Sequence, residues 1–294
     1  MSKVSVVIPA LNEEEPIAGV VRECFATGVP GEVIVVDNGS TDRTAERASA
    51  AGARVITAPR GYGRACAAGA RAVSGECDIV VFLDGDGSDI PAFIPQLVEP
   101  ITRGTHDFVI GSRTRGRRET GSMNFQQILS GRIAGRITQL LYGVRYTDMC
   151  PFRAIRRDAL AKLDMREETY GWNLEMQMKA ARARLRILEI PVNHRCRTGG
   201  ESKVSGTLRG TFVAGTRIIA TLFRVALQRP KRPEGGPSPR RNPSGDSGIR
   251  NVASPMVSML DLERFRATPL TREPFEFLIV PEFVKADARA AFKT

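Results

Sequence analysis

The sequence predicts an α/β protein built on a mostly parallel, Rossmann-like sheet. Short apolar segments rich in Val and Ile recur along the chain, helix-like segments separate them, and polar residues directly follow several of them. Such apolar runs are typical of strands buried on both faces, and their alternation with helices is typical of a doubly wound parallel sheet. The 294 residues are enough for one large domain with an appendage.

The predicted elements alternate from the start of the chain. In the first helical segment Asn12 is a candidate N-cap, Pro16 stands near the start and Gly28 follows the end, and these residue types mark helix boundaries. The predicted strands cover residues 4–10, 32–37, 53–59, 78–87, 106–113 and 187–197, and the predicted helices cover residues 12–28, 41–52, 60–75, 124–143, 171–185 and 205–228.

The composition changes after Gln228. Residues 229–251 are rich in Pro, Gly and Arg, a composition that cannot bury a core and predicts disorder. We therefore expect a main domain over residues 1–228, a disordered linker over residues 229–253 and a C-terminal segment of unknown function over residues 254–294.

Charge and residue content restrict the classes of function. The net charge of +11 suggests an anionic partner, which could be a nucleic acid, a phosphorylated substrate or a membrane surface. Aromatic residues make up only 6% of the chain and are not interleaved with basic ones, which disfavours nucleic acid. The absence of GxGxxG after the first strand disfavours a dinucleotide-dependent dehydrogenase.

Cysteine and histidine usage limits the chemistry further. The five cysteines are scattered and none lies in a CxxC pair, which favours reduced thiols in a cytosolic protein over disulfides or a zinc site. With only two histidines, a metal would have to rest on carboxylates. No signal peptide and no apolar run long enough to span a bilayer is expected.

The segment VVFLDGDGSD, residues 80–89, carries the strongest functional signal. It runs from a predicted buried strand directly into Asp84 and Asp86, which would repel each other. A solvated turn is one interpretation, and a hard cation such as Mg²⁺ or Mn²⁺ is the other. Because Asn12, Asp37 and the glycines around Tyr62 also follow predicted strands, and ligands bind at the carboxyl ends of parallel strands, the metal site is favoured.

Several motifs together resemble the inverting glycosyltransferases of family 2. They are VVIPALNE, VVDNGSTDRT, RGYGRA, FLDGDGSD, IGSR and RTGGESK, in that order, and the likeness is greatest to the branch with dolichyl-phosphate mannose synthases and glucosyltransferases. It covers about residues 3–228. The resemblance implies a GT-A fold with helices flanking the sheet and a C-terminal amphipathic helix before the disordered tail.

The resemblance also implies roles for individual residues. The implied metal ligands for Mg²⁺ or Mn²⁺ are Asp84 and Asp86, and the implied nucleotide-binding residues are Pro9, Ala10, Asn12, Glu13, Asp37, Gly63, Arg64 and Asp84. The implied catalytic residues are Asp84, Asp86, Arg113, Arg197 and Lys203, and the implied acceptor-binding residues are Arg113, Ser130, Glu175 and Ser202. Ser88 stands where the lipid-phosphate branch often has Gln, which leaves the third protein ligand open.

The function expected from this resemblance is hexose transfer, with inversion, from UDP-glucose or GDP-mannose to a polyprenyl phosphate. The enzyme would be cytoplasmic and peripheral on the inner face of the membrane, with the arginine-containing helices 124–143 and 205–228 at the interface. A phosphate acceptor is already a nucleophile and needs no base. The alternative is a soluble hydroxyl acceptor, for which Asp148 or Glu175 would serve as the base. A basic nucleic-acid-binding module is the remote alternative.

Overall fold

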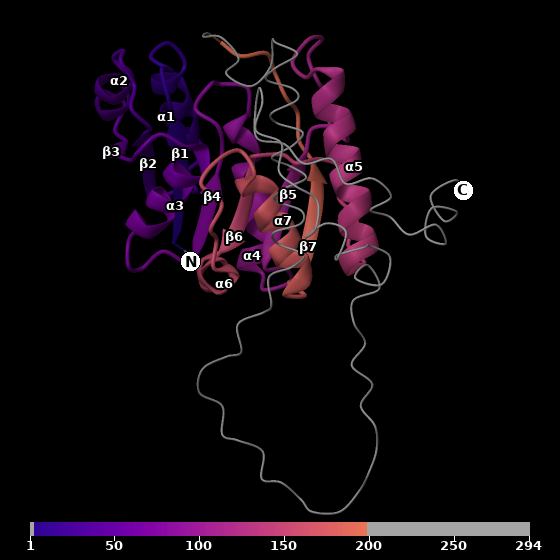
Figure 1. Ribbon diagram of the computed structural model, residues 1–294. Helices are drawn as coiled ribbons and strands as arrows, with labels where there is room; N and C mark the ends of the chain where they lie inside the picture. Colours follow the sequence, from indigo (N-terminus) through magenta and orange to yellow (C-terminus); the bar gives the residue numbers. More distant parts are fainter. Residues whose placement is uncertain (1–2, 199–294) are drawn as a thin grey trace, which may run out of the picture. The chain divides into compact units, whose positions relative to one another are not determined.

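In the computed structural model, which describes residues 3–198, the strands form one sheet (Figure 1). Within those residues the sheet has seven strands in the order β3-β2-β1-β4-β6-β5-β7, and β6 runs antiparallel to both of its neighbours. The strands are β1 Val4–Ala10, β2 Glu32–Asp37, β3 Arg54–Thr57, β4 Ile79–Phe82, β5 Phe108–Ser112, β6 Arg153–Arg156 and β7 Ile187–Pro191. The prediction of a mostly parallel sheet is confirmed.

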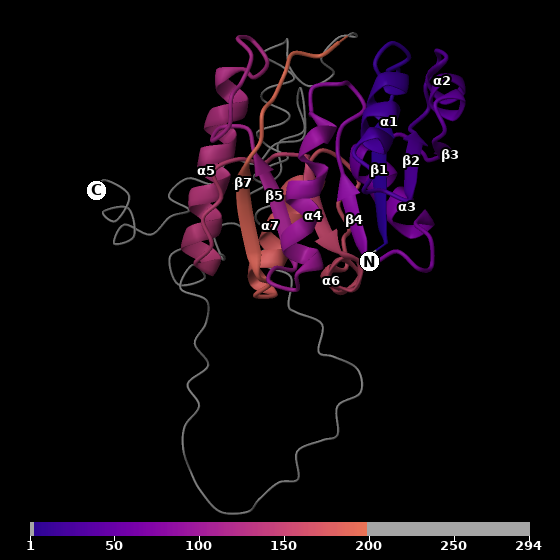
Figure 2. The same ribbon diagram turned by 180° about the vertical axis from the view of Figure 1, so that it is seen from behind.

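Helices cover both faces of this sheet. They are α1 Ile17–Ala26, α2 Thr44–Ala50, α3 Tyr62–Ala72, α4 Ile94–Thr102, α5 Phe125–Tyr142, α6 Arg157–Leu163 and α7 Trp172–Arg182, with a 3₁₀ turn at Pro91–Phe93. α3 packs on β1 and β2, and α4 packs on β4, β5 and β6 from the opposite face (Figure 2). All seven residues of β1 are buried, so the core lies along the central strands, as their apolar sequences predict.

The strand β6 was not predicted from the sequence. It contains only four residues, with arginines at both ends, and so lacks the apolar run that marked the other strands. Arg153 is nevertheless fully buried. Its guanidinium donates to the backbone carbonyls of Cys150, Pro151 and Asn173 and lies over the ring of Phe108, so that its charge is satisfied inside the core.

The first helix begins later than predicted, and Asn12 does not cap it. α1 starts at Ile17, with Pro16 at the cap position. Asn12 has a φ of 52°, and its Oδ1 accepts a hydrogen bond of 2.8 Å from the Thr41 backbone N–H. Asn12 therefore joins the loop after β1 to the loop after β2, because its side chain accepts from a backbone N–H of the second loop and not from the helix start.

The helix predicted over residues 124–143 is confirmed as α5. Asn124 and Gln127 form a reciprocal capping box at its start, and Gly143, with a φ of 74°, ends it in the left-handed conformation. No helix within residues 3–198 is long and apolar enough to cross a membrane. The predicted helix 205–228, the linker 229–253 and the segment 254–294 lie outside the described residues.

Candidate active site

A cavity of about 800 Å³ opens where the central strands end. Residues that follow β1, β2, β4 and β5 line it, together with residues of α5 and of the segment after β7. The predicted site residues that line the cavity are Pro9, Ala10, Glu13, Asp84, Asp86, Arg113, Ser130 and Arg197. The chain thus brings polar groups from several strand ends together, as expected for a sheet of this kind.

Carboxylates are concentrated in the loop of residues 84–89, which we call the acid loop. Asp86 is 4% exposed, and its Oδ1 accepts hydrogen bonds from the Ser88 N–H at 2.8 Å and from the Ser88 hydroxyl at 2.6 Å. Asp84 accepts a hydrogen bond of 3.0 Å from the Tyr62 hydroxyl. Ser88 therefore holds Asp86 in place, a role that the sequence alone did not reveal.

The carboxylates of the acid loop lie close enough together to raise one another's pKa. Burial and the charge of Asp86 raise the pKa of Asp84 to about 7. Burial and the charge of Asp84 raise the pKa of Asp89, whose carboxylate accepts from the Asp84 N–H, to about 8. Buried carboxylates that destabilise each other's charged forms are the environment that a cation relieves.

Asp84 and Asp86 supply only part of the ligands that a divalent cation needs. Among residues 3–198 no group of three or more His, Cys, Asp or Glu side chains is arranged to hold a metal ion. Mg²⁺ and Mn²⁺, however, are commonly bound by one or two carboxylates together with the phosphates of a substrate. Asp84 and Asp86 fit a site of that kind, in which a bound diphosphate completes the ligands.

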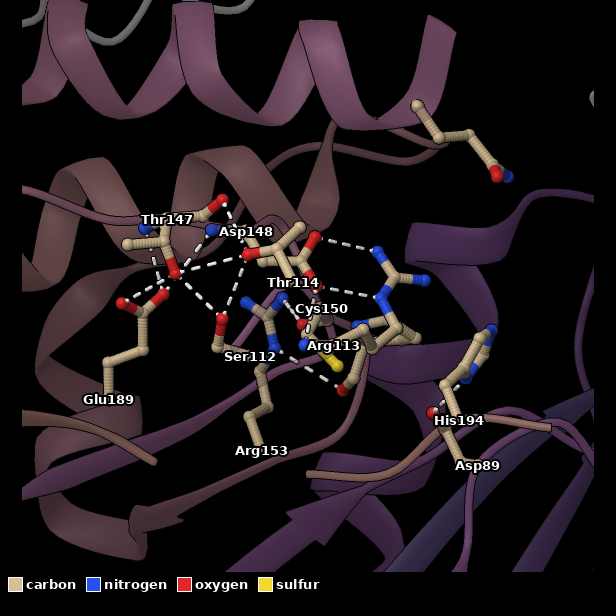
Figure 3. Close-up of polar contacts among 12 residues, drawn as sticks. Asp89, Ser112, Arg113, Thr114, Thr147, Asp148, Cys150, Arg153, Glu189 and His194 are labelled. Atoms are coloured by element: carbon tan, nitrogen blue, oxygen red, sulfur yellow. Dashed lines mark hydrogen bonds and ion pairs between the residues drawn. The ribbon is translucent and has the colours of Figure 1, made fainter. Parts of the chain in front are cut away.

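Two arginines, Arg113 and Arg197, also line the cavity. Arg197 lies in residues 193–198, which we call the arm, and its Nη2 is 2.7 Å from Oδ2 of Asp86. Arg113 follows β5 and forms a two-pronged pair with Asp148, with both Nε–Oδ2 and Nη2–Oδ1 distances at 2.8 Å (Figure 3). Paired donors of this geometry suit phosphate oxygens as well as carboxylates.

Asp148 is committed to Arg113. Its side chain is 2% exposed, and, although burial opposes this, the charge of Arg113 and its hydrogen bonds hold the pKa of Asp148 below its usual value. A hydrogen-bonded group of Ser112, Thr147 and Glu189 lies beside this pair (Figure 3). Asp148 does not line the cavity, and its hydrogen bonds orient the guanidinium of Arg113.

Glu175 likewise lies outside the cavity lining. It is fully buried in α7, where its Oε2 accepts from the N–H groups of Arg166 and Glu167 at 3.0 and 2.7 Å, and its Oε1 is 2.8 Å from Nζ of Lys179. These contacts fix the loop before α7, which carries Tyr170. The carboxylate therefore supports that loop from outside the cavity lining.

Four of the predicted nucleotide-binding residues support the cavity from outside its lining. Asn12 joins two loops, as described above, and Asp37 accepts from the Ser40 N–H at 3.0 Å. Arg64 pairs with Glu168. A Cβ atom at Gly63 would lie 2.1 Å from the Glu167 carbonyl oxygen, so this glycine lets α3 approach the loop before α7. Ser202 and Lys203 lie outside the described residues.

Residues that were not singled out as ligands also line the cavity. Tyr62 and Tyr170 stack with ring centroids 6.3 Å apart, and Oδ1 of Asn38 accepts a hydrogen bond of 3.0 Å from the Gly61 N–H. His194 lies beside Asp89, with 3.7 Å between Nδ1 and Oδ1. Burial and the charge of Arg113 lower the pKa of His194 to about 4, so the ring is neutral near neutral pH. Of these residues, only Tyr62 could have been recognised from the sequence, because it stands between Gly61 and Gly63 in the glycine-rich turn that follows a predicted strand.

The chain is similar to known glycosyltransferases over most of the described region. The family model for glycosyl transferase family 2 matches residues 5–164. A glycosyltransferase of Mycobacterium tuberculosis is 37% identical over 216 residues, 72% of this chain and 94% of that protein. The undecaprenyl-phosphate mannosyltransferase of Micrococcus luteus is 32% identical over 225 residues, 72% of this chain and 91% of that protein.

Among solved structures, the fold resembles glucosyl-3-phosphoglycerate synthase from Mycobacterium tuberculosis. The structure of that protein with Mn²⁺, UDP-glucose and phosphoglyceric acid matches with a TM-score of 0.62 and 28% identity, over 76% of this chain and 80% of that one. A second structure, with phosphoglyceric acid, matches with a TM-score of 0.63 over the same shares.

Proposed function

Because the chain belongs to glycosyl transferase family 2, we propose that it transfers a hexose from a nucleoside-diphosphate sugar to an acceptor that carries a phosphate group. One observation carries the proposal: the carboxylates of Asp84 and Asp86 and the guanidinium groups of Arg113 and Arg197 line one cavity at the strand ends. Such an arrangement has a place for a cation and separate donors for phosphate oxygens.

The donor would lie across the ends of β1 and β4. Pro9, Ala10 and Glu13 would contact the nucleoside, and the diphosphate would reach Asp84 and Asp86. Mg²⁺ or Mn²⁺ bound there would offset the charge that develops on the leaving diphosphate. The structural neighbour with Mn²⁺ and UDP-glucose supports this assignment. Arg197 would add a charged hydrogen-bond donor on the same side.

For the acceptor, a soluble phosphorylated molecule is the first candidate, ahead of the lipid expected from the sequence. The neighbours of known structure bind phosphoglyceric acid and share 28% of their residues with this chain, which supports the soluble-acceptor alternative. Arg113 would bind the acceptor phosphate. If the reacting group of this acceptor is a hydroxyl, the reaction needs a base. Asp148 and Glu175, the bases expected from the sequence, are both engaged elsewhere, so another group would have to serve as the base.

Polyprenyl phosphate is the second candidate, and α5 is the reason to keep it. Ser130 on this helix lines the cavity, while Phe125, Leu129, Ile133 and Leu140 are 74, 43, 48 and 48% exposed. Arg132 and Arg136 are exposed on the same helix. A helix that presents apolar and basic residues together suits an anionic membrane surface. Likeness to the undecaprenyl-phosphate mannosyltransferase supports the same acceptor, and a location on the inner membrane face goes with it.

One assay separates the two acceptors. The purified chain is given UDP-glucose or GDP-mannose with Mn²⁺, and either 3-phosphoglycerate or undecaprenyl phosphate, with glycerate and undecaprenol as unphosphorylated controls. Transfer to 3-phosphoglycerate supports the first candidate, and transfer to undecaprenyl phosphate alone supports the second. Equal transfer to an acceptor and its unphosphorylated control would contradict the phosphate requirement, and no hydrolysis or transfer of either donor would contradict the proposed activity.

A further inference from the structure

The acid loop has no regular secondary structure and is paired along its length by the arm. The Arg195 N–H donates to the Ser88 carbonyl at 3.1 Å, and the Thr198 N–H donates to the Asp86 carbonyl at 3.3 Å. Asp89 and His194 form an isolated antiparallel bridge. The arm follows β7 and the acid loop follows β4, so two segments far apart in the sequence hold each other.

The contact leaves almost no space at Gly87. This residue has a φ of 77°, and a Cβ atom there would lie 2.7 Å from Oγ1 of Thr198 and 3.4 Å from Cβ of Pro16. The backbone of the acid loop is thus enclosed between the arm and the start of α1. A small rotation of the loop would bring it against one of them.

The side chain of Arg195 makes the most specific contact between the two segments. Its Nε donates to the Gly87 carbonyl oxygen at 2.5 Å, and its Nη2 is 3.0 and 2.9 Å from the two carboxylate oxygens of Glu23 on α1. The guanidinium therefore ties the acid loop to a helix that packs in the core. An exposed ion pair by itself would contribute little to the stability of the fold. The same guanidinium, however, also donates a hydrogen bond to the acid loop.

The hydrogen bond from Arg195 reaches the Gly87–Ser88 peptide group, which also orients Asp86. The Gly87 carbonyl and the Ser88 N–H belong to one planar peptide unit, whose two ends must turn together. The oxygen of this unit accepts from Arg195, and its N–H donates to Oδ1 of Asp86 at 2.8 Å. The direction of the Asp86 carboxylate is therefore coupled to Arg195 through a single rigid group.

We propose that Arg195 is a positioning residue, which sets the orientation of the Asp86 carboxylate by holding the Gly87–Ser88 peptide between the arm and Glu23. This inference rests on the proposed metal-binding role of Asp86. It assigns no contact with substrate to Arg195. Its prediction is that loss of Arg195 weakens cation binding even when no sugar is transferred.

The test measures Mn²⁺ affinity by isothermal titration calorimetry in the presence of UDP, without an acceptor. Arg195→Ala should raise the Kd for Mn²⁺ roughly tenfold, the scale of one lost hydrogen bond to a charged group. The Kd of Arg195→Lys should lie between those of Arg195→Ala and the unchanged chain, because the lysine ammonium can still reach either Gly87 or Glu23. Glu23→Gln keeps the bond to Gly87 and should change the Kd by less than about threefold. In turnover, Arg195→Ala should be rescued by raising the Mn²⁺ concentration.

A matched control is Arg103→Ala, which removes an exposed arginine paired with Glu99 on α4 and should leave the Kd unchanged. Circular dichroism of each variant checks that it is folded. If Arg195→Ala is folded and binds Mn²⁺ as the unchanged chain does, the role of Arg195 is overturned and the metal site stands. If the unchanged chain binds no Mn²⁺ with UDP, the metal role of Asp86 is overturned and this inference with it.

Discussion

Arg197 and Asp86 form an ion pair in the cavity, with Nη2 of the guanidinium 2.7 Å from Oδ2 of the carboxylate. The side chain of Asp86 is 5% exposed and that of Arg197 is 34% exposed, so the pair is partly desolvated. The family resemblance implied that Asp86 is a metal ligand and that Arg197 is a catalytic residue. If Asp86 binds a cation as we propose, the cation and Arg197 would share one carboxylate, and binding of one would affect the other.

Replacement of Asp86 with Ala should abolish transfer and leave the fold intact. We expect a loss of at least about a hundredfold in turnover, because removal of preorganised charge from an active site has effects of that size. Asp86 is not part of the apolar core, so the variant should still unfold in one cooperative transition, although the lost contacts with Ser88 and Arg197 should lower its midpoint slightly. Turnover with Mn²⁺ and the unfolding curve are measured together, with Asp158→Ala, an exposed carboxylate on α6, as the control. Turnover equal to that of the unchanged chain would remove Asp86 from the metal site.

Arg197→Ala should separate catalysis from cation binding. A lost charged hydrogen bond is worth about 1.5–3 kcal/mol, and about 1.36 kcal/mol corresponds to tenfold in rate. Transfer should therefore fall roughly ten- to a hundredfold, while the affinity for Mn²⁺ stays equal or rises because Asp86 loses a competing partner. Arg118→Ala, at an exposed position, should cost several-fold at most. Weaker Mn²⁺ binding in Arg197→Ala would show that Arg197 supports the carboxylate rather than competing for it.

Asp148→Asn should impair both stability and transfer. The substitution leaves Arg113, whose side chain is 13% exposed, without its countercharge, and removing one partner of a buried pair typically costs about 3–5 kcal/mol. Because an Asn side chain keeps one acceptor, we expect the lower end of that range. Denaturant unfolding measures the stability, and the KM for the acceptor should rise more than the KM for the donor. An unchanged KM for the acceptor would exclude Arg113 from acceptor binding.

Asp107 should make the stability of the fold sensitive to acid. Its carboxylate accepts from Nε and Nη2 of Arg186 at 3.0 and 2.8 Å, and the Arg186 hydrogen bonds lower its pKa from 3.8 to about 2. A depressed pKa means that the stabilisation is complete above the unfolded value and is lost as the pH falls through about 2.

Asp107→Asn should therefore lower the free energy of unfolding at neutral pH, by about 1–3 kcal/mol. The difference from the unchanged chain should shrink below pH 3.8 and vanish near pH 2. Denaturant unfolding at a series of pH values measures it. A difference that stays constant over this range would mean that the Asn variant is destabilised by packing and not by the lost charge.

The parts of this protein that the sequence predicted are those encoded locally. β1, β2 and β4 are apolar runs between helical segments, and all or most of their residues are buried, as such runs predict. The acidic residues after β4 and the loop residues after β1 were placed correctly at one edge of the sheet, because the carboxyl ends of parallel strands must meet there. The convergence of Asp84, Asp86 and Arg113 on one cavity was therefore predictable.

What the tertiary structure alone decided are the pairings between segments distant in the chain. The insertion of β6 between β4 and β5 depends on hydrogen bonds across the sheet. Those bonds produce no recognisable hydrophobic pattern in the sequence of a four-residue strand. Arg195 and the carbonyl of Gly87 are 108 residues apart, and the pairing of Asp148 with Arg113 spans 35. The sequence determined which charged groups the site would contain. Only folding decided which of them neutralise each other, since a buried charge pairs with whatever countercharge the packed backbone brings within reach.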